Sequence, residues 1–209
     1  MKIVRGLQNA IEVLVDGRGL NLSTISSHAQ ERIAEVFGES LPPIRAVELI
    51  LKQVREGGDE ALRYLTRRLE GRDSVVIEVP QTVVNRAYRS VPDDLIKALE
   101  LAATRICRFH EMSLPKKWID SDSGYGELVN PVERVGAYVP GGTARYPSTV
   151  LMTAIPAKVA GVSEVIVATP GGEMDTPHPA VLVAADIAGV DKIFHIGGAQ
   201  AIAAMVYGT

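Results

Sequence analysis

Three pairs of adjacent glycines are the residues of this sequence whose spacing could form a ligand site: Gly141-Gly142, Gly171-Gly172 and Gly197-Gly198. Each pair closely follows a short run of apolar, mostly β-branched residues and precedes a helical pattern. Glycine lets the backbone adopt positive φ or lie close against a ligand, and the free N–H groups of a helix N-terminus attract anions. No pair belongs to a G-x-G-x-x-G dinucleotide motif, and one pair alone is more often simple turn chemistry. The recurrence of the pair in three places is what indicates a ligand site.

The most distinctive of these places is the stretch Glu133–Pro147. Its apolar run, Val135–Val139, stops at Pro140-Gly141-Gly142, because proline cannot continue a strand ladder. Tyr138 therefore stands at the end of the predicted strand. A helical pattern starts near Ser148, and the hydroxyl of Ser148 or Thr149 can cap its first turn. The stretch predicts a strand, a glycine loop and a helix N-terminus in succession.

Cysteine and histidine supply the other candidate side chains. Cys107 and His110 lie three apart in a helical pattern, so they could form a metal-binding pair. No second pair follows at zinc-finger spacing, and we interpret them as a small core thiol and a packed or capping histidine. His195 lies just before Gly197 and could be taken for a base, but the sequence offers it no positioned partner. We therefore expect His195 to be a neighbour of the ligand site, and we expect no metal ligands in this chain.

From about residue 131 onward, predicted strands and helices alternate regularly. These elements must position the glycine pairs. Three β-branched strands alternate with three helices, which is typical of βαβ units with a parallel sheet and right-handed crossovers. In such a sheet all three glycine loops emerge at the same edge, where ligands of open α/β sheets bind. The expected strands are Val135–Val139, Val165–Ala168 and Ile193–Ile196, and the expected helices are Ser148–Ala160, His178–Gly189 and Ala199–Val206.

Residues 1 to about 128 do not show this alternation, because helical patterns dominate there. Strand-like patterns occur there only at 75–79 and 11–15, and a polar, irregular segment at 116–126 leads to a boundary between 120 and 131. We therefore predict an α/β protein of two parts, a helix-rich part (1–128) and a βαβ part (131–209). The helices expected in the first part are 43–54, 59–69, 81–90 and 92–112, and Gly57-Gly58 separates the first two.

Composition narrows the classes of function. The chain has 209 residues, 46% of them hydrophobic, and a net charge of −3 without a basic block, which argues against nucleic acid as a partner. No apolar stretch reaches membrane-spanning length, and the N-terminus lacks the apolar run of a signal peptide. Cys107 is the only cysteine, so no internal disulfide can form. A reducing, cytoplasmic setting fits this composition best.

Five motifs of this sequence belong together: Val135-Gly-Ala-Tyr-Val-Pro-Gly-Gly142, Ser148-Thr-Val-Leu-Met152 with Pro156-Ala157 and Ala160-Gly161, Ile196-Gly-Gly-Ala-Gln-Ala-Ile-Ala-Ala204, Gly57-Gly-Asp-Glu-Ala-Leu-Arg63 and Phe109-His110. Together they resemble the N-terminal half of histidinol dehydrogenase. The resemblance extends from about residue 43 to the last residue, is dense after 131, and has its motifs in the order that the family has them.

The resemblance implies a fold, a reaction and a cofactor. It implies an incomplete Rossmann-like parallel-sheet domain preceded by a helix-rich segment, which would be an incomplete first α/β domain. The family oxidises L-histidinol through the aldehyde to L-histidine, using two NAD in succession and a zinc ion that holds the substrate. By motif, Tyr138 and Gln200 would contact NAD, at an edge that also contains Pro140, Gly141 and Gly142. Residues 131–209 would then be the NAD-binding part.

This sequence departs from the family's pattern in its length. The family's zinc ligands, its paired Glu-His acid/base motif and a further NAD-contacting asparagine all match positions beyond Thr209. We therefore expect no catalytic residues in this chain, no turnover by the chain alone, and a homo-oligomer formed through sheet edge and apolar surface left exposed. Two alternatives stay open at this point: a relative that oxidises another small alcohol, and a non-catalytic nucleotide-binding or interaction module built on the same sheet.

Overall fold

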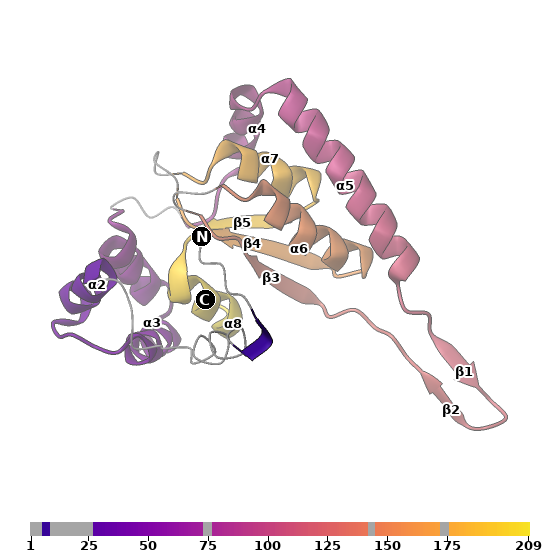
Figure 1. Ribbon diagram of the computed structural model, residues 1–209, viewed down its shortest axis with the longest axis horizontal. Helices are drawn as coiled ribbons and strands as arrows, with labels where there is room; N and C mark the ends of the chain where they lie inside the picture. The colour runs from indigo at the N-terminus through magenta and orange to yellow at the C-terminus, as the bar shows by residue number, and fades with distance from the viewer. Residues whose placement is uncertain (1–5, 9–26, 73–76, 142–144, 172–175) are drawn as a thin grey trace. The chain divides into compact units, whose positions relative to one another are not determined.

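The computed structural model describes residues 6–8, 27–72, 77–141, 145–171 and 176–209 (Figure 1). The chain divides into two compact units, Met1–Leu49 and Ile50–Thr209. The first unit contains α2 (Ser27–Phe37) and the beginning of α3 (Pro43–Glu70). The strand-like pattern at 11–15 lies outside the described residues.

A parallel sheet forms the centre of the second unit. Its strands are β3 (Arg134–Tyr138), β4 (Glu164–Thr169) and β5 (Lys192–His195), paired side by side in the order β3-β4-β5. Because both pairings are parallel, the predicted βαβ arrangement and the α/β class are confirmed, while the Rossmann-like relationship stays a prediction. The short segment 77–79 pairs antiparallel with β5 through Glu78 and Phe194. It is the described end of the strand predicted at 75–79.

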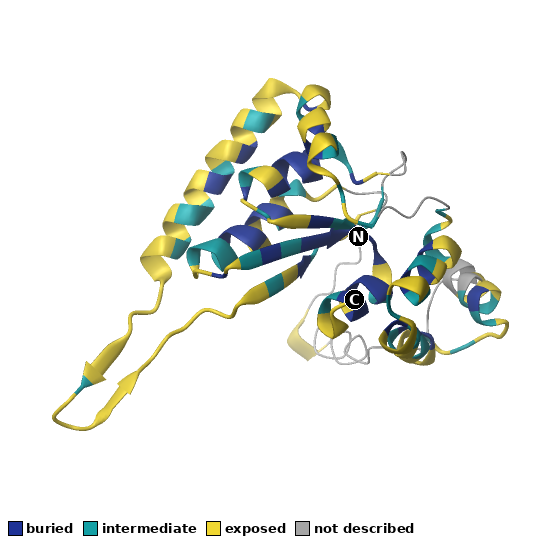
Figure 2. Cartoon of the chain, turned by 180° about the vertical axis from the view of Figure 1, so that it is seen from behind, coloured by how far each residue is buried: buried dark blue, intermediate teal, exposed yellow. Residues whose placement is uncertain are grey.

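Two layers of helices cover one face of this sheet (Figures 1 and 2). The inner layer is α6 (Pro147–Val159) and α7 (Pro179–Ile187). Outside it lie α4 (Gln81–Ala87), the 3₁₀ turn η1 (Tyr88–Ser90) and α5 (Asp93–Ser113), with α5 packed on α6 and α4 on α7. Each fully buried Val or Leu stabilises the fold by about 1.5–3 kcal/mol. The fully buried Val and Leu residues of this core are Val139, Val150, Leu151, Val165, Val167, Leu182 and Val183.

Helix α8 (Gly198–Tyr207) lies against the sheet at β3, and Gly136 permits its close approach. A Cβ on Gly136 would stand 2.6 Å from the Met205 sulfur, so any side chain there would require Met205 to move. Within the second unit, α8 also contacts α3, because the Arg55 guanidinium lies 5.8 Å from the centre of the Tyr207 ring. The middle of α3 thereby lies next to α8.

Helix α3 is divided at Gly58, where φ is 51° and ψ is −137°. This conformation is outside the helical region and is essentially restricted to glycine. The sequence predicted two helices separated by Gly57-Gly58, and the structure confirms this division. The segment after the division buries Leu62, Leu65 and Thr66 and ends at Glu70.

An antiparallel hairpin, β1 (Trp118–Asp120) and β2 (Tyr125–Glu127), occupies the segment interpreted from sequence as irregular. That interpretation was wrong, because side-chain and glycine turn chemistry closes the hairpin. The Asp120 carboxylate accepts hydrogen bonds from the N–H groups of Asp122 and Ser123, and Gly124 has φ 75°. The hairpin extends away from the sheet and its helices (Figures 1 and 2).

The hairpin stands where a boundary between the parts 1–128 and 131–209 was predicted. Packing of α4 and α5 on α6 and α7 crosses that position, and the compact units divide elsewhere, after Leu49. The apolar stripe of α5 explains the packing, since Leu99 and Ala103 are buried in the core of the second unit. The division of the whole protein into domains at this boundary stays a prediction.

None of the helices in the described parts of the chain has the length and apolar character needed to cross a membrane.

Candidate functional site

The three glycine loops meet at the carboxyl edge of the sheet, as the sequence predicted. A Cβ on Gly141 would lie 2.8 Å from Pro170, and a Cβ on Gly197 would lie 2.6 Å from the same proline. A Cβ on Gly171 would lie 2.5 Å from Nε2 of His195. The absence of side chains at these glycines is therefore what lets the loops approach one another. Gly142 and Gly172, the second members of two pairs, lie outside the described residues.

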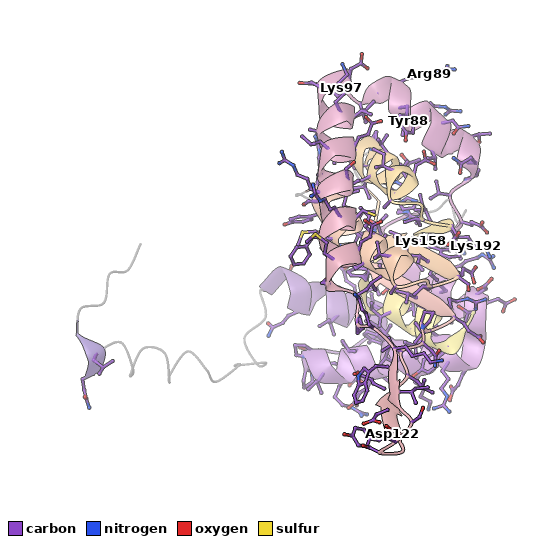
Figure 3. All side chains as sticks on the ribbon, turned by 90° about the vertical axis from the view of Figure 1, so that its right-hand side faces the viewer. Tyr88, Arg89, Lys97, Asp122, Lys158 and Lys192 are labelled. Carbon is purple, nitrogen blue, oxygen red and sulfur yellow. The ribbon has the colours of Figure 1, made fainter. Side chains whose placement is uncertain are left out.

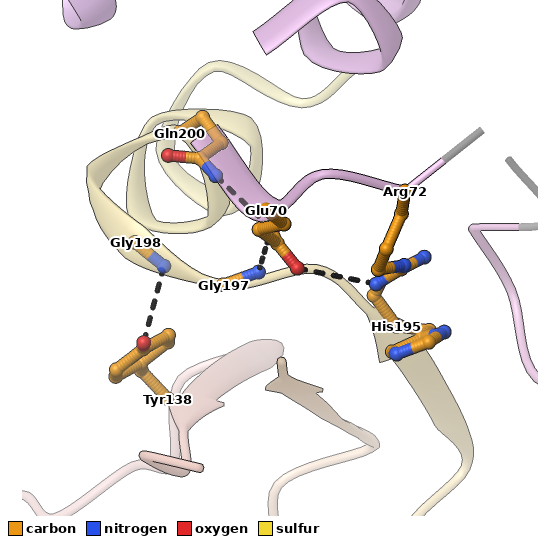
Figure 4. A network of polar contacts seen from close by, with 7 residues as sticks. All are labelled: Glu70, Arg72, Tyr138, His195, Gly197, Gly198 and Gln200. Atoms are coloured by element: carbon orange, nitrogen blue, oxygen red, sulfur yellow. Dashed lines mark hydrogen bonds and ion pairs between the residues drawn. The ribbon is translucent and has the colours of Figure 1, made fainter. Parts of the chain in front are cut away.

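Tyr138 joins the end of β3 to the first turn of α8. It is the last residue of β3 and is half-buried, and its hydroxyl oxygen accepts a hydrogen bond of 3.1 Å from the Gly198 N–H (Figure 4). This N–H belongs to the first turn of α8 and has no carbonyl partner within the helix. Tyr138 thus caps the helix with its hydroxyl and keeps part of its ring at the glycine edge.

Gln200 is folded inward rather than toward solvent. Gln200 is only 1% exposed, and its Nε2 donates a hydrogen bond of 3.1 Å to Oε1 of Glu70. Its carbonyl oxygen, Oε1, is buried and has no hydrogen-bond partner among the described residues. This oxygen lies over Gly198, where an added Cβ would stand 2.6 Å from it and where φ is 64°. Gln200 and Tyr138 therefore both adjoin Gly198.

Glu70, which the sequence analysis did not single out, connects these groups (Figure 4). Its Oε1 accepts hydrogen bonds from the Gly197 N–H at 2.9 Å and from Gln200. Its Oε2 forms an ion pair of 3.2 Å with Arg72, which also donates to the His195 carbonyl oxygen at 3.1 Å. The Glu70 and Arg72 side chains are only 14% and 10% exposed. A half-buried, paired carboxylate thus ties the end of α3 to the end of β5 and the start of α8.

One local signal in the sequence could have pointed to Glu70. It is the last residue of α3, and a carboxylate is unfavourable near the negative end of a helix dipole, where Arg67 and Arg68 are the expected type. A residue that breaks a local rule often has a tertiary reason to be present. The reason here is the start of α8, whose positive end the carboxylate faces.

The remaining sequence candidates lie at different places. His195 is 4% exposed and lies beside Gly171, so it is a neighbour of the glycine edge as predicted. Cys107 is a half-buried thiol on α5, and burial followed by the Glu111 carboxylate raises its pKa. The His110 ring packs edge-on against Phe109, with 5.2 Å between the ring centres. Within the described ranges, no three His, Cys, Asp or Glu side chains are placed to hold a metal ion.

A separate cavity of about 620 Å³ opens between α8, the middle of α3 and the sheet. Arg134, Glu164 and Lys192 line it at the amino ends of the strands, and Ile166 and Phe194 form its apolar floor. Tyr138, Pro140 and Gln200 do not line this cavity. It is therefore distinct from the glycine edge.

Comparison with known proteins identifies the family. The family model described as histidinol dehydrogenase matches residues 41–209. A histidinol dehydrogenase of Geobacter sulfurreducens is 49% identical over 168 residues, which cover 77% of this chain and 38% of that protein. A histidinol dehydrogenase of Dehalococcoides mccartyi is 41% identical over 210 residues, which cover 100% of this chain and 48% of that protein.

A solved structure has the same fold. The crystal structure of histidinol dehydrogenase from Elizabethkingia anophelis superposes with a TM-score of 0.76 at 32% identity, covering 82% of this chain and 40% of that one. The chain thus spans less than half the length of each of these relatives. Since the model match covers most of the sequence and the fold agrees, this chain belongs to the histidinol dehydrogenase family.

Proposed function

We propose that this chain is the NAD-binding portion of a histidinol dehydrogenase, the enzyme that oxidises L-histidinol through the aldehyde to L-histidine. The observation that carries the proposal is the meeting of three glycine loops at one sheet edge, beside Tyr138 and Gln200. Open α/β sheets bind their ligands at this edge. Family membership supports the choice of NAD and histidinol over other nucleotides and alcohols.

The residues present at the edge fit a dinucleotide. Pro140 and Gly141 are exposed, and Gly141 has no side chain to keep a ligand from the backbone. The half-buried Tyr138 ring offers an apolar face, while its hydroxyl is satisfied by Gly198. The carbonyl oxygen of Gln200, beside Gly198, is an acceptor without a hydrogen-bond partner among the described residues, and a ligand donor could use it. We propose these residues, together with Gly142, as the NAD contacts.

In this proposal the chain binds and orients the cofactor and the rest of the enzyme supplies the chemistry. When bound, NAD accepts the hydride that leaves the alcohol carbon. Tyr138 and Gln200 hold it at the carboxyl edge, and the close packing of Gly141 and Gly197 on Pro170 keeps that edge rigid. A zinc site and an acid/base pair belong to the whole enzyme, which we propose to be a cytoplasmic homo-oligomer.

The proposal is tested by titrating NAD into the purified chain in a calorimeter. We expect weak binding, and we expect Tyr138→Ala and Gln200→Ala each to weaken it about three- to tenfold, because each loses a contact of about 0.5–1.5 kcal/mol. Tyr125→Ala is the matched control, since Tyr125 is 61% exposed on the hairpin. Equal binding by all variants would show that the site is wrong. No binding by the unmodified chain would contradict the function and favour an interaction module.

A further inference from the structure

We propose that Glu70 is a positioning residue for the NAD site, a role that rests on the function proposed above. In this role its carboxylate holds the Gly197-Gly198 loop and the Gln200 amide in the arrangement that the cofactor meets. Glu70 itself does not touch NAD. Its side chain is half-buried and lies against the Gly197 N–H and the Gln200 amide.

The first argument is that one carboxylate oxygen controls two parts of the site. Oε1 of Glu70 accepts from the backbone of Gly197 at 2.9 Å and from the side chain of Gln200 at 3.1 Å. The second bond selects the orientation of the Gln200 amide: its NH₂ group faces Glu70 and its carbonyl oxygen faces Gly198 (Figure 4). Without this acceptor the amide could rotate and present either group.

The second argument is that the position requires a carboxylate. Oε2 of Glu70 faces the Arg72 guanidinium at 3.2 Å, so both oxygens act as acceptors. A glutamine here would have one acceptor and one donor. Its NH₂ group would face either the guanidinium or the N–H groups of Gly197 and Gln200, and a donor facing a donor loses the bond.

The third argument is electrostatic. Glu70 lies at the N-terminus of α8, where the helix dipole favours a negative charge, and burial strengthens these hydrogen bonds. Arg72, which is paired with Glu70, also donates a hydrogen bond to the carbonyl oxygen of His195 at the end of β5. The loop between β5 and α8 is therefore held from its strand side and its helix side by the same ion pair.

The test compares NAD binding by the unmodified 209-residue chain with that by Glu70→Gln, with Glu60→Gln as the matched control. Glu60 is exposed on the same helix, so its variant removes an equal charge without touching the loop. We expect Glu70→Gln to weaken NAD binding about tenfold and Glu60→Gln to leave it unchanged. Unchanged binding by Glu70→Gln would overturn the proposal even though NAD binds.

A double-mutant cycle separates positioning from a general loss of stability. In a Gln200→Ala background, Glu70→Gln should weaken NAD binding by only about threefold, because one of its two contacts is already gone. A purely structural role gives the same factor in both backgrounds, and that result would refute positioning. Urea unfolding of each variant verifies that the protein is folded at the titration temperature.

A second measurement does not require NAD. Amide hydrogen exchange followed by NMR on the ligand-free chain should be faster at Gly197 in Glu70→Gln, and unchanged there in Glu60→Gln. Unchanged exchange at Gly197 would refute the proposal independently of the cofactor. If exchange increases but the unmodified chain binds no NAD, then Glu70 holds the loop and the proposed function is what fails.

Discussion

At the scale of single residues, carboxylates form hydrogen bonds and ion pairs that hold the ends of the strands. At the amino end of β4, Asp191 accepts hydrogen bonds from the Lys158 ammonium at 2.6 Å and from the Val165 N–H at 2.7 Å. Glu164 is paired with both Lys192 and Arg134, and Lys158 and Lys192 project at this end of the sheet (Figure 3). These carboxylates anchor the amino ends of the strands, as Glu70 anchors the carboxyl end of β5.

Asp191 gives a prediction about pH. The bond from Lys158, followed by that from Val165, lowers the pKa of Asp191 in the folded protein. Its contribution to stability is therefore complete above the unfolded pKa of about 3.9 and is lost as the pH falls through the lower folded value. Because the side chain is 39% exposed, solvent screens the pair, and we expect Asp191→Asn to cost about 0.5–1 kcal/mol at pH 7.

Urea unfolding at pH 7 and pH 3 measures this effect. The difference between the unmodified chain and Asp191→Asn should shrink at pH 3, where the carboxylate of the unmodified chain is partly protonated. Asp122→Asn, on the exposed hairpin turn, is the control and should leave stability unchanged at both pH values. A difference that grows as the pH falls would contradict the assignment.

At the scale of elements, the division of α3 at Gly58 matters most for the site. It lets residues 59–70 take their own direction, so that this half of the helix lies next to α8 and ends with Glu70 under the Gly197 loop. No atom lies within 4 Å of a Cβ built on Gly58, so the requirement for glycine there is conformational and not steric. A regular helix through this position would carry Glu70 away from the loop.

We accordingly predict that Gly58→Ala destabilises the chain by about 1–3 kcal/mol, because alanine disfavours a backbone with φ 51° and ψ −137°. Urea unfolding measures the change, with Glu60→Ala as the control at a helical, exposed position of the same element. In an ordinary helix interior, Gly→Ala stabilises instead. A stabilised Gly58→Ala protein would therefore show that the helix continues through this residue.

At the scale of the whole molecule, the described second unit is a sheet with its helices, and the chain spans 38% to 48% of the length of the two relatives described above. Oxidation of an alcohol needs a base for the hydroxyl proton and a group that stabilises the developing alkoxide. The resemblance assigns these tasks to residues that match no position in this chain. We therefore expect that the chain can bind the cofactor without oxidising the alcohol.

We predict that the chain, supplied with NAD, histidinol and zinc, produces no measurable NADH. The measurement is absorbance of NADH over time, with an intact histidinol dehydrogenase as the positive control in the same buffer. Turnover that follows the chain through purification and disappears in Tyr138→Ala would contradict the prediction. Such a result would place catalytic groups within residues 1–209.

The sequence by itself determined the local elements and their order. Runs such as Val135–Val139 have a strand pattern whatever surrounds them, and the crossover rule then puts the three glycine loops at one edge. The same logic placed Tyr138 at the end of β3 and separated the helices at Gly58. These features depend on periodicity, glycine and proline, which are properties of neighbouring residues.

Only the tertiary structure decided what those residues contact. Glu70 is separated from Gly197 and Gln200 by 127 and 130 positions, and the partner of the Tyr138 hydroxyl is 60 positions away. No pattern in the sequence connects such residues, because hydrogen bonds across packed elements depend on how helices and strands are arranged in space. The hairpin β1–β2 was missed for a related reason: strands of three residues are too short for periodicity to show, and their pairing depends on the turn around Asp120.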